Sequence, residues 1–317
     1  MLQPTLSNGG HPRNAPKELV PMKNIFFKIF TSLLLLLNLT AYSCKKAPVT
    51  ISQNLPKTVP QRILSLSPAS TEILCALGAM DKIKGRSEFC DYPPEVQSIP
   101  VIGSFDGKTI SSETLLSYNP DFVYLTAHMH DNFISLLSSK NISYYVSTAN
   151  SIEEIASEII TISKVLDNQT RGNELAGQIL SFRDECLKLN QQKSRDSKEF
   201  PSIYWEIWTP PYMSVGNLSF INEIVTLAGG INIFAQIPET YPIVSDEAII
   251  AANPDFIILP NHTTTSIDSI KQRAGWQNIN AVKNNQIYSI DADIISRPGP
   301  RCIQAIQIIR NIINEKK

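Results

Sequence analysis

Three of the four histidines in the chain could together hold a metal ion. His128 and His130 are separated by one methionine after a predicted strand, and His262 occupies the equivalent place in a later segment. Residues two apart share a face of an extended segment, and imidazole nitrogens are common ligands of metal ions and haem iron. Histidines in loops are usually solvated, however, so we predict no metal site and no resident cofactor.

Two other side chains could serve as the nucleophile of a hydrolase. Cys90 lies in a predicted loop, and Ser67 precedes a predicted helix. Neither belongs to a recognisable nucleophile motif, and neither has a histidine beside it in sequence that could act as a base. A hydrolase is therefore an alternative that requires pairing through the fold, and we predict that the protein is not an enzyme.

The strongest pattern in the chain is an internal repeat. Residues 110–125 and 244–259 both read Ser-x-Glu, then an apolar pair, Asn-Pro-Asp-Phe and a short apolar run. Ser111 and Ser245 are predicted helix caps. The Asn-Pro pair ends each helix, because a residue before proline avoids the helical region, and the apolar run predicts a buried strand. A unit that occurs twice predicts two similar lobes with a ligand cleft between them.

Each copy of the repeat places one glutamate in the first turn of its helix. Glu113 and Glu247 follow the capping serine by two residues, where the helix dipole favours an anion. In two similar lobes these carboxylates would be exposed at equivalent places.

Length, charge and periodicity define the fold class. The 317 residues suffice for two domains, and a net charge of -1 offers no basic surface for nucleic acid. Strand and helix patterns alternate over 61–150 and again over 200–317, whereas 151–192 carries only helical patterns, including an apolar stripe from Leu175 to Leu189. We therefore predict an α/β protein of two lobes with central sheets, tethered by a long helix.

The N-terminal segment 1–43 is predicted to be an upstream extension followed by a signal peptide. Five leucines at 33–37 follow Lys23 and Lys28, which gives a charged start and an apolar run too short for a membrane span. The polar stretch before Met22 is unlike a signal, so Met22 is the predicted true start.

Cys44 is a predicted lipidation site. Ala-Tyr-Ser-Cys, ending at Cys44, resembles a bacterial lipobox, and 44–60 has the composition of a linker. Acyl chains on this cysteine would anchor an extracytoplasmic protein to a membrane. The alternative is a plain secreted protein with a free cysteine.

Six short segments, in this order, resemble the helical-backbone (class III) substrate-binding proteins of ABC importers, most of all those that bind vitamin B12 (cobalamin). They are RILSLSPASTEILCALG, CDYPPE, the two repeat copies, LAGGINIF and SRPGPR. The resemblance covers about residues 60–315. It implies two α/β lobes joined by one long backbone helix, a cleft for a small molecule, and an ABC permease with its ATPase as partners.

The resemblance also assigns roles to residues. It implies that Glu113 and Glu247 dock into arginines of the permease; the alternative is that they serve only their helix dipoles. It places Tyr92, Phe105, Tyr241, Asp293 and Arg297 in the ligand cleft. Phe105 and Tyr241 stand where cobalamin binders often have tryptophan. The alternatives are surface packing for the aromatics and an internal ion pair for Asp293 and Arg297.

Strand alternation adds one more candidate to the cleft. Trp205 and Trp208 fall on opposite faces of the predicted strand, and Trp208 is nearer the following loop. We therefore predict a core position for Trp205 and a cleft position for Trp208. Trp276 is predicted to pack.

Together these patterns predict a monomeric, lipid-anchored binding protein that delivers a corrinoid to an ABC permease. A ferric siderophore or haem is the alternative cargo, and it would call on cations such as Arg297 and Arg86. A surface sensor or scavenger without a transporter is a further alternative.

Overall fold

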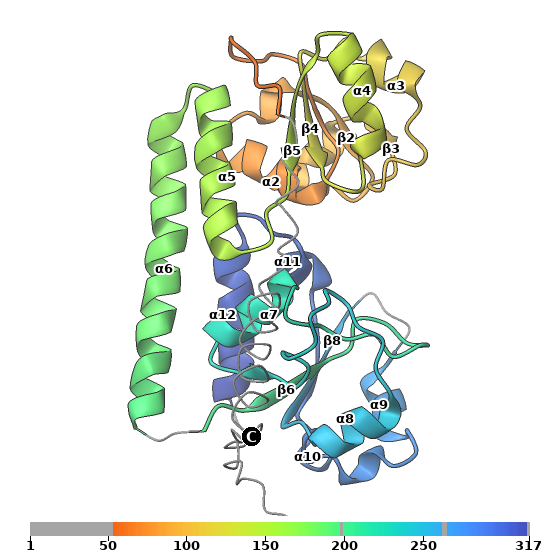
Figure 1. Cartoon of the computed structure of the whole chain (residues 1–317), viewed down its shortest axis with the longest axis vertical. Coiled ribbons are helices and arrows are strands. Elements are labelled where there is room, and N and C mark those ends of the chain that lie inside the picture. The colour runs from red at the N-terminus through yellow and green to blue at the C-terminus, as the bar shows by residue number, and fades with distance from the viewer. Residues whose placement is uncertain (1–52, 197–198, 262–264, 316–317) are drawn as a thin grey trace, which may run out of the picture. The chain divides into compact units, whose positions relative to one another are not determined.

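The computed structural model describes residues 53–196, 199–261 and 265–315 (Figure 1). The predicted signal peptide, Met22, Cys44 and most of the linker lie outside these residues, as does His262. No helix within the described ranges is long and apolar enough to cross a membrane.

The first lobe is a five-stranded parallel sheet in the order β3-β2-β1-β4-β5. Its strands are β1 (Ile63–Ser65), β2 (Ile83–Ser87), β3 (Val101–Gly103), β4 (Phe122–Thr126) and β5 (Ser143–Ser147). Helix α2 (Pro68–Ala76) lies on one side, and α3 (Ser112–Ser117) and α4 (Asp131–Ser139) lie on the other (Figure 1). Because both faces are covered, β4 is apolar on both: Phe122 joins the α2 side and Val123 the α3–α4 side.

The second lobe is a four-stranded parallel sheet in the order β7-β6-β8-β9. Its strands are β6 (Ser202–Trp205), β7 (Ile231–Asn232), β8 (Phe256–Pro260) and β9 (Ile287–Ile290). Its helices are α7 (Phe220–Leu227), α8 (Asp246–Ala252), α9 (Ile267–Lys271), α10 (Asn280–Lys283), α11 (Ala292–Ser296) and α12 (Cys302–Asn314). The two parallel sheets confirm the predicted α/β lobes.

Two helices connect the lobes: α5 (Ile152–Val165) and the 27-residue α6 (Gln169–Arg195), which pack against each other (Figure 1). At one end of α6, the side-chain amide of Asn168 donates to the backbone carbonyl of Leu77 (2.9 Å), the C-cap residue of α2. At the other end, the amide of Asn190 donates to the carbonyl of Thr226 in α7 (2.9 Å). The predicted backbone helix is therefore fixed to a helix C-terminus in each lobe.

One apolar core runs through both lobes. Side chains of β1, β4, α5 and α6 belong to the same buried cluster as those of β6, β8, α7 and α12. Burial of this continuous surface stabilises the fold and opposes separation of the lobes.

The end of α6 differs from the sequence expectation. Helical patterns were predicted over 151–192, yet α6 continues to Arg195. The sequence contains no glycine or proline between Gly177 and Pro201, so no residue there forces an earlier end of the helix. At the other end of this region, Ser151 caps α5.

The two repeat copies form the same structure in both lobes. Ser111 and Ser245 cap α3 and α8, and the asparagines that end these units adopt left-handed backbone angles (φ 47° and 45°). The aspartate of each copy binds the start of the lobe's first strand. Asp121 accepts from the backbone N–H of Arg62 (2.8 Å), and Asp255 accepts from that of Ser202 (2.9 Å).

These aspartates give a matched pair of stability predictions. Asp121→Ala and Asp255→Ala each remove a carboxylate acceptor from backbone donors, and we expect each to lower the free energy of unfolding by about 1–2 kcal/mol. Urea unfolding followed by circular dichroism would measure the loss. Asp81→Ala, at an exposed aspartate with only a 3.8 Å contact to Lys82, should change it by less than about 0.5 kcal/mol. If Asp121→Ala and Asp255→Ala had the same free energy of unfolding as Asp81→Ala, the role of these aspartates in binding the strand starts would be contradicted.

Candidate functional site

All six residues predicted to line the cleft follow the carboxyl ends of strands. Tyr92 follows β2, Phe105 follows β3, Trp208 follows β6, Tyr241 follows β7, and Asp293 and Arg297 follow β9. Parallel α/β sheets bind ligands outside the carboxyl ends of their strands, where the connections diverge. The candidate site is therefore assembled from the corresponding edges of both sheets.

Exposed apolar side chains lie in these connections and in the one after β4. In the first lobe they are Phe89, Tyr92 and Met129, and in the second Trp208, Leu218, Tyr241 and Ile243. Each keeps 40–66% of its surface exposed. Large apolar groups left in water on a well-packed protein mark a binding surface.

In the first lobe, the aromatic group is built from two neighbouring loops. Phe89 and Phe105 meet edge to face with ring centroids 5.4 Å apart. The Phe105 loop is held by His130, whose Nε2 lies 2.9 Å from the carbonyl oxygen of Phe105. Sequence reasoning missed Phe89, although it stands directly before the Cys-Asp-Tyr-Pro loop that carries Tyr92.

In the second lobe, Trp208 and Tyr241 lie on segments joined by backbone pairing. Met213 bridges to Trp208 on one side and to Ile243 on the other. Trp208 is 53% exposed, and its indole N–H donates to the carbonyl of Pro210 (3.1 Å). Trp205 is buried, which confirms its predicted core position, and the cleft position of Trp208 stays a prediction.

A buried ion pair supports this second-lobe segment. Glu206, directly after β6, is 2% exposed and accepts from both terminal nitrogens of Arg273, one at 2.8 Å. The guanidinium lies over the rings of Trp276 (4.5 Å) and Tyr212 (5.0 Å). Trp276 is fully buried and packs, as predicted.

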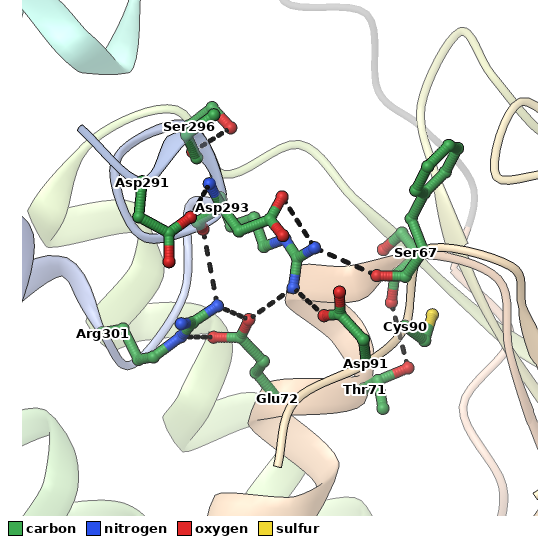
Figure 2. Close-up of polar contacts among 12 residues, drawn as sticks. Ser67, Thr71, Glu72, Cys90, Asp91, Asp291, Asp293, Ser296 and Arg301 are labelled. Carbon is green, nitrogen blue, oxygen red and sulfur yellow. Dashed lines mark hydrogen bonds and ion pairs between the residues drawn. The ribbon is translucent and has the colours of Figure 1, made fainter. Parts of the chain in front are cut away.

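The two lobes meet at a buried carboxylate, Glu72 of α2, which is 2% exposed (Figure 2). Its two oxygens accept from Nε and Nη2 of Arg301 (2.9 and 2.6 Å), a bidentate pair. Oε1 also accepts from Nη1 of Arg297 (3.2 Å). One first-lobe acid therefore holds two second-lobe arginines across a separation of more than 220 residues.

Arg297 has three further partners. Nη1 donates to Asp91 (2.7 Å), and Nη2 donates to the carbonyl of Phe89 (3.0 Å). Nη2 also forms an ion pair with Asp293 (2.8 Å). Burial disfavours the charged form of this side chain, but the neighbouring carboxylates outweigh it and raise its pKa above the ordinary value for arginine. Asp91 and Asp293 each keep nearly half of their side-chain surface exposed.

Two further arginines near the site have structural roles. Arg301 joins the lobes through Glu72, and its guanidinium lies over the ring of Tyr92 at 4.1 Å. Arg86 was a candidate cleft cation. It is buried, and it donates to the backbone carbonyls of Val96 (2.9 Å) and Ser87 (3.2 Å).

Glu72 was missed by sequence reasoning. The available signal was a lone charge in the apolar segment that forms α2. A charged residue rarely points into a core without a partner, but the sequence does not say which of 28 basic residues that partner is.

The histidines do not form the shared face expected of an extended segment. His128 is exposed and adopts φ 66°, whereas His130 is fully buried. Nδ1 of His130 accepts from the backbone N–H of Thr126 (2.9 Å), and burial lowers its pKa. Across the described residues, no group of three or more His, Cys, Asp or Glu could hold a metal ion.

The two candidate nucleophiles have structural partners. Cys90 is buried beside the hydroxyl of Ser87 (3.1 Å), and burial raises its pKa, which disfavours the thiolate. Ser67 caps α2, and its hydroxyl lies 2.6 Å from that of Ser70.

The two paired glutamates occupy equivalent, exposed positions. Glu113 and Glu247 each lie in the first turn of their helix. A backbone N–H and the hydroxyl of the capping serine lower the pKa of both carboxyls. Both are therefore ionised at neutral pH and free to meet a cation.

The interlobe pairing predicts a large effect at Glu72. Glu72→Ala leaves two buried guanidinium groups without their shared carboxylate, and we expect a loss of about 3–5 kcal/mol in the free energy of unfolding. Thermal and urea unfolding would measure it. Glu95→Ala, at an exposed glutamate in the same lobe, should stay within about 0.5 kcal/mol of the parent. A similarly small effect at Glu72 would show that the pairing is not important for stability.

Comparisons with known proteins point to one group. A family model described as periplasmic binding protein matches residues 63–294. The vitamin B12-binding protein of Vibrio parahaemolyticus is 29% identical over 248 residues, which cover 78% of this chain and 86% of that protein. An uncharacterized ABC transporter substrate-binding lipoprotein of Bacillus subtilis is 29% identical over 271 residues, covering 82% and 83%.

A solved structure matches as well. The periplasmic vitamin B12 binding protein of Vibrio cholerae aligns with a TM-score of 0.69 at 26% identity. The alignment covers 81% of this chain and 97% of that one.

Proposed function

Since the chain belongs to the periplasmic binding protein family, a family of transport substrate-binding proteins, we propose that it captures a corrinoid such as cobalamin and delivers it to an ABC permease. The observation that carries this proposal is the set of exposed aromatic side chains at the carboxyl ends of both sheets, beside half-exposed Asp91 and Asp293.

The chemistry of that edge suits a corrinoid. Such a ligand presents a large, partly apolar face and a rim of amides. Phe89, Tyr92, Trp208 and Tyr241 offer apolar area for the face. Carboxylate oxygens accept hydrogen bonds from amide N–H groups, and Asp293 is the predicted acceptor. The vitamin B12-binding relatives support this cargo.

The place of the protein in the cell is proposed from the N-terminal sequence. Cys44 would be lipidated after removal of the signal peptide, and the linker would tether the two lobes to a membrane outside the cytoplasm. The similar Bacillus subtilis protein, a substrate-binding lipoprotein, supports this arrangement.

Titration with cyanocobalamin tests the cargo. We expect one-to-one binding by calorimetry to the chain from Lys45 onward, and a loss of about 10- to 100-fold in affinity for Trp208→Ala, because a central aromatic contact contributes about 1–3 kcal/mol. Leu189→Ala, at an exposed apolar residue of α6, should bind like the parent. Absence of cobalamin binding would refute this cargo, and parallel titrations with haem and a ferric siderophore would then identify the alternative.

Charge reversal tests the docking glutamates. Glu113→Arg and Glu247→Arg should leave the Kd for cargo unchanged but abolish delivery, because two like charges would face the basic sites proposed on the permease. Uptake of labelled cargo into vesicles that contain the permease and its ATPase would measure delivery. Glu174→Arg, at an exposed glutamate of α6 that pairs only with Arg171 within 4.0 Å, is the matched control.

Two results would decide against this docking role. Normal uptake by the double charge-reversal variant would refute it directly. If the parent protein itself drives no uptake, the sensor or scavenger alternative would replace delivery.

A further inference from the structure

The charged groups at the meeting of the lobes are unequal in number. Three carboxylates, from Glu72, Asp91 and Asp293, surround the two guanidinium groups of Arg297 and Arg301 (Figure 2). Each terminal nitrogen of Arg297 already lies within 3.2 Å of two oxygens. The polar surface left for a ligand here is therefore mainly that of the two half-exposed carboxylates, Asp91 and Asp293.

The connections that leave the strand ends share this bias. Five of them, 88–100, 104–111, 206–219, 233–245 and 291–301, contain eight acidic and three basic residues. The acids are Glu88, Asp91, Glu95, Asp106, Glu206, Glu239, Asp291 and Asp293, and the bases are Lys108, Arg297 and Arg301. The chain as a whole is nearly balanced at -1, so these five connections are more acidic than the rest of the chain.

The cations near this edge have partners of their own. Lys108 lies 2.8 Å from Asp106, Arg273 pairs with Glu206, and Arg86 donates to backbone carbonyls. A carboxylate on a cargo would therefore have to compete with an existing carboxylate for Lys108 or Arg273, and with backbone carbonyls for Arg86.

We infer that Asp91 and Asp293 act as specificity residues that favour cargo with hydrogen-bond donors, such as the primary amides of a corrinoid, and reject cargo that presents carboxylates. This inference rests on the proposed function, since it refines the chemistry of the same site. Like charges brought together in a cleft disfavour binding strongly, and specificity arises as readily from such repulsion as from attraction.

The test compares two probes that differ in one group. Cyanocobalamin and its monocarboxylic acid, in which one side-chain amide is hydrolysed, have nearly the same size and shape. We expect the parent protein to bind cyanocobalamin about 10- to 100-fold more tightly than the acid isomer whose carboxylate lies at Asp91 and Asp293. Calorimetric titration of each isolated acid isomer would measure the ratio.

Variants assign the effect to the two aspartates. Asp91→Asn and Asp293→Asn keep an oxygen that accepts from Arg297 but remove one negative charge each. We expect each single variant to lower the ratio of the affinities for cyanocobalamin and for that acid isomer. The double variant should bind the two probes equally well. Asp184→Asn, at a similarly exposed aspartate of α6 that pairs with Arg183, should retain the parent ratio. Circular dichroism would confirm folding, and the single variants decide the matter if the double variant is unstable.

Haem, which carries two propionates, separates this inference from the proposed cargo. If cyanocobalamin does not bind but the aspartate variants bind haem more tightly than the parent, the proposed cargo is wrong. The rejection of carboxylates by Asp91 and Asp293 would then stand. If every acid isomer binds the parent protein as tightly as cyanocobalamin does, the rejection of carboxylates is overturned and the proposed cargo stands. If both single variants keep the parent ratio of affinities for cyanocobalamin and the acid isomer, the role of the two aspartates is also overturned.

Discussion

The structure depends most on a single buried carboxylate that holds two arginines from the opposite lobe. Glu72 is almost completely buried, so its charge is tolerable only because Arg297 and Arg301 approach it directly. The same contact fixes the turn between α11 and α12 against α2. Together with the shared apolar core and the two ends of α6, it holds the lobes at three separate places. Lobes held together in this way keep the strand ends of both sheets in place, which would reduce the ordering cost of binding a ligand there.

The same ion pairs determine the chemistry that the site offers. Arg297, which follows α11 in the connection after β9, suggests an anion site when the sequence is considered alone. In the fold, its donors are directed to Glu72, Asp91, Asp293 and a backbone carbonyl. The outward surface is then aromatic and weakly acidic. A surface of this kind suits a large ligand with an apolar face and amide donors better than a small anionic chelate.

The internal repeat explains why the outer surface has matched features. In each lobe the same serine cap, the same left-handed asparagine and the same strand-binding aspartate recur. The glutamate after each cap is thereby set at the same point relative to its sheet. Because the lobes are fixed to each other, the separation of Glu113 and Glu247 is also fixed, which is the condition for two carboxylates to serve as one docking surface.

The sequence by itself determined what depends on local chemistry. The caps at Ser111 and Ser245 and the strands after Asn-Pro-Asp follow from backbone preference and from the short apolar runs. Only the tertiary structure decided the partners of Glu72, the burial of His130 but not His128, and the interlobe role of Arg301. The physical reason is that buried charges are satisfied by whichever groups the packing of distant elements brings within hydrogen-bond range, and no local pattern encodes that meeting.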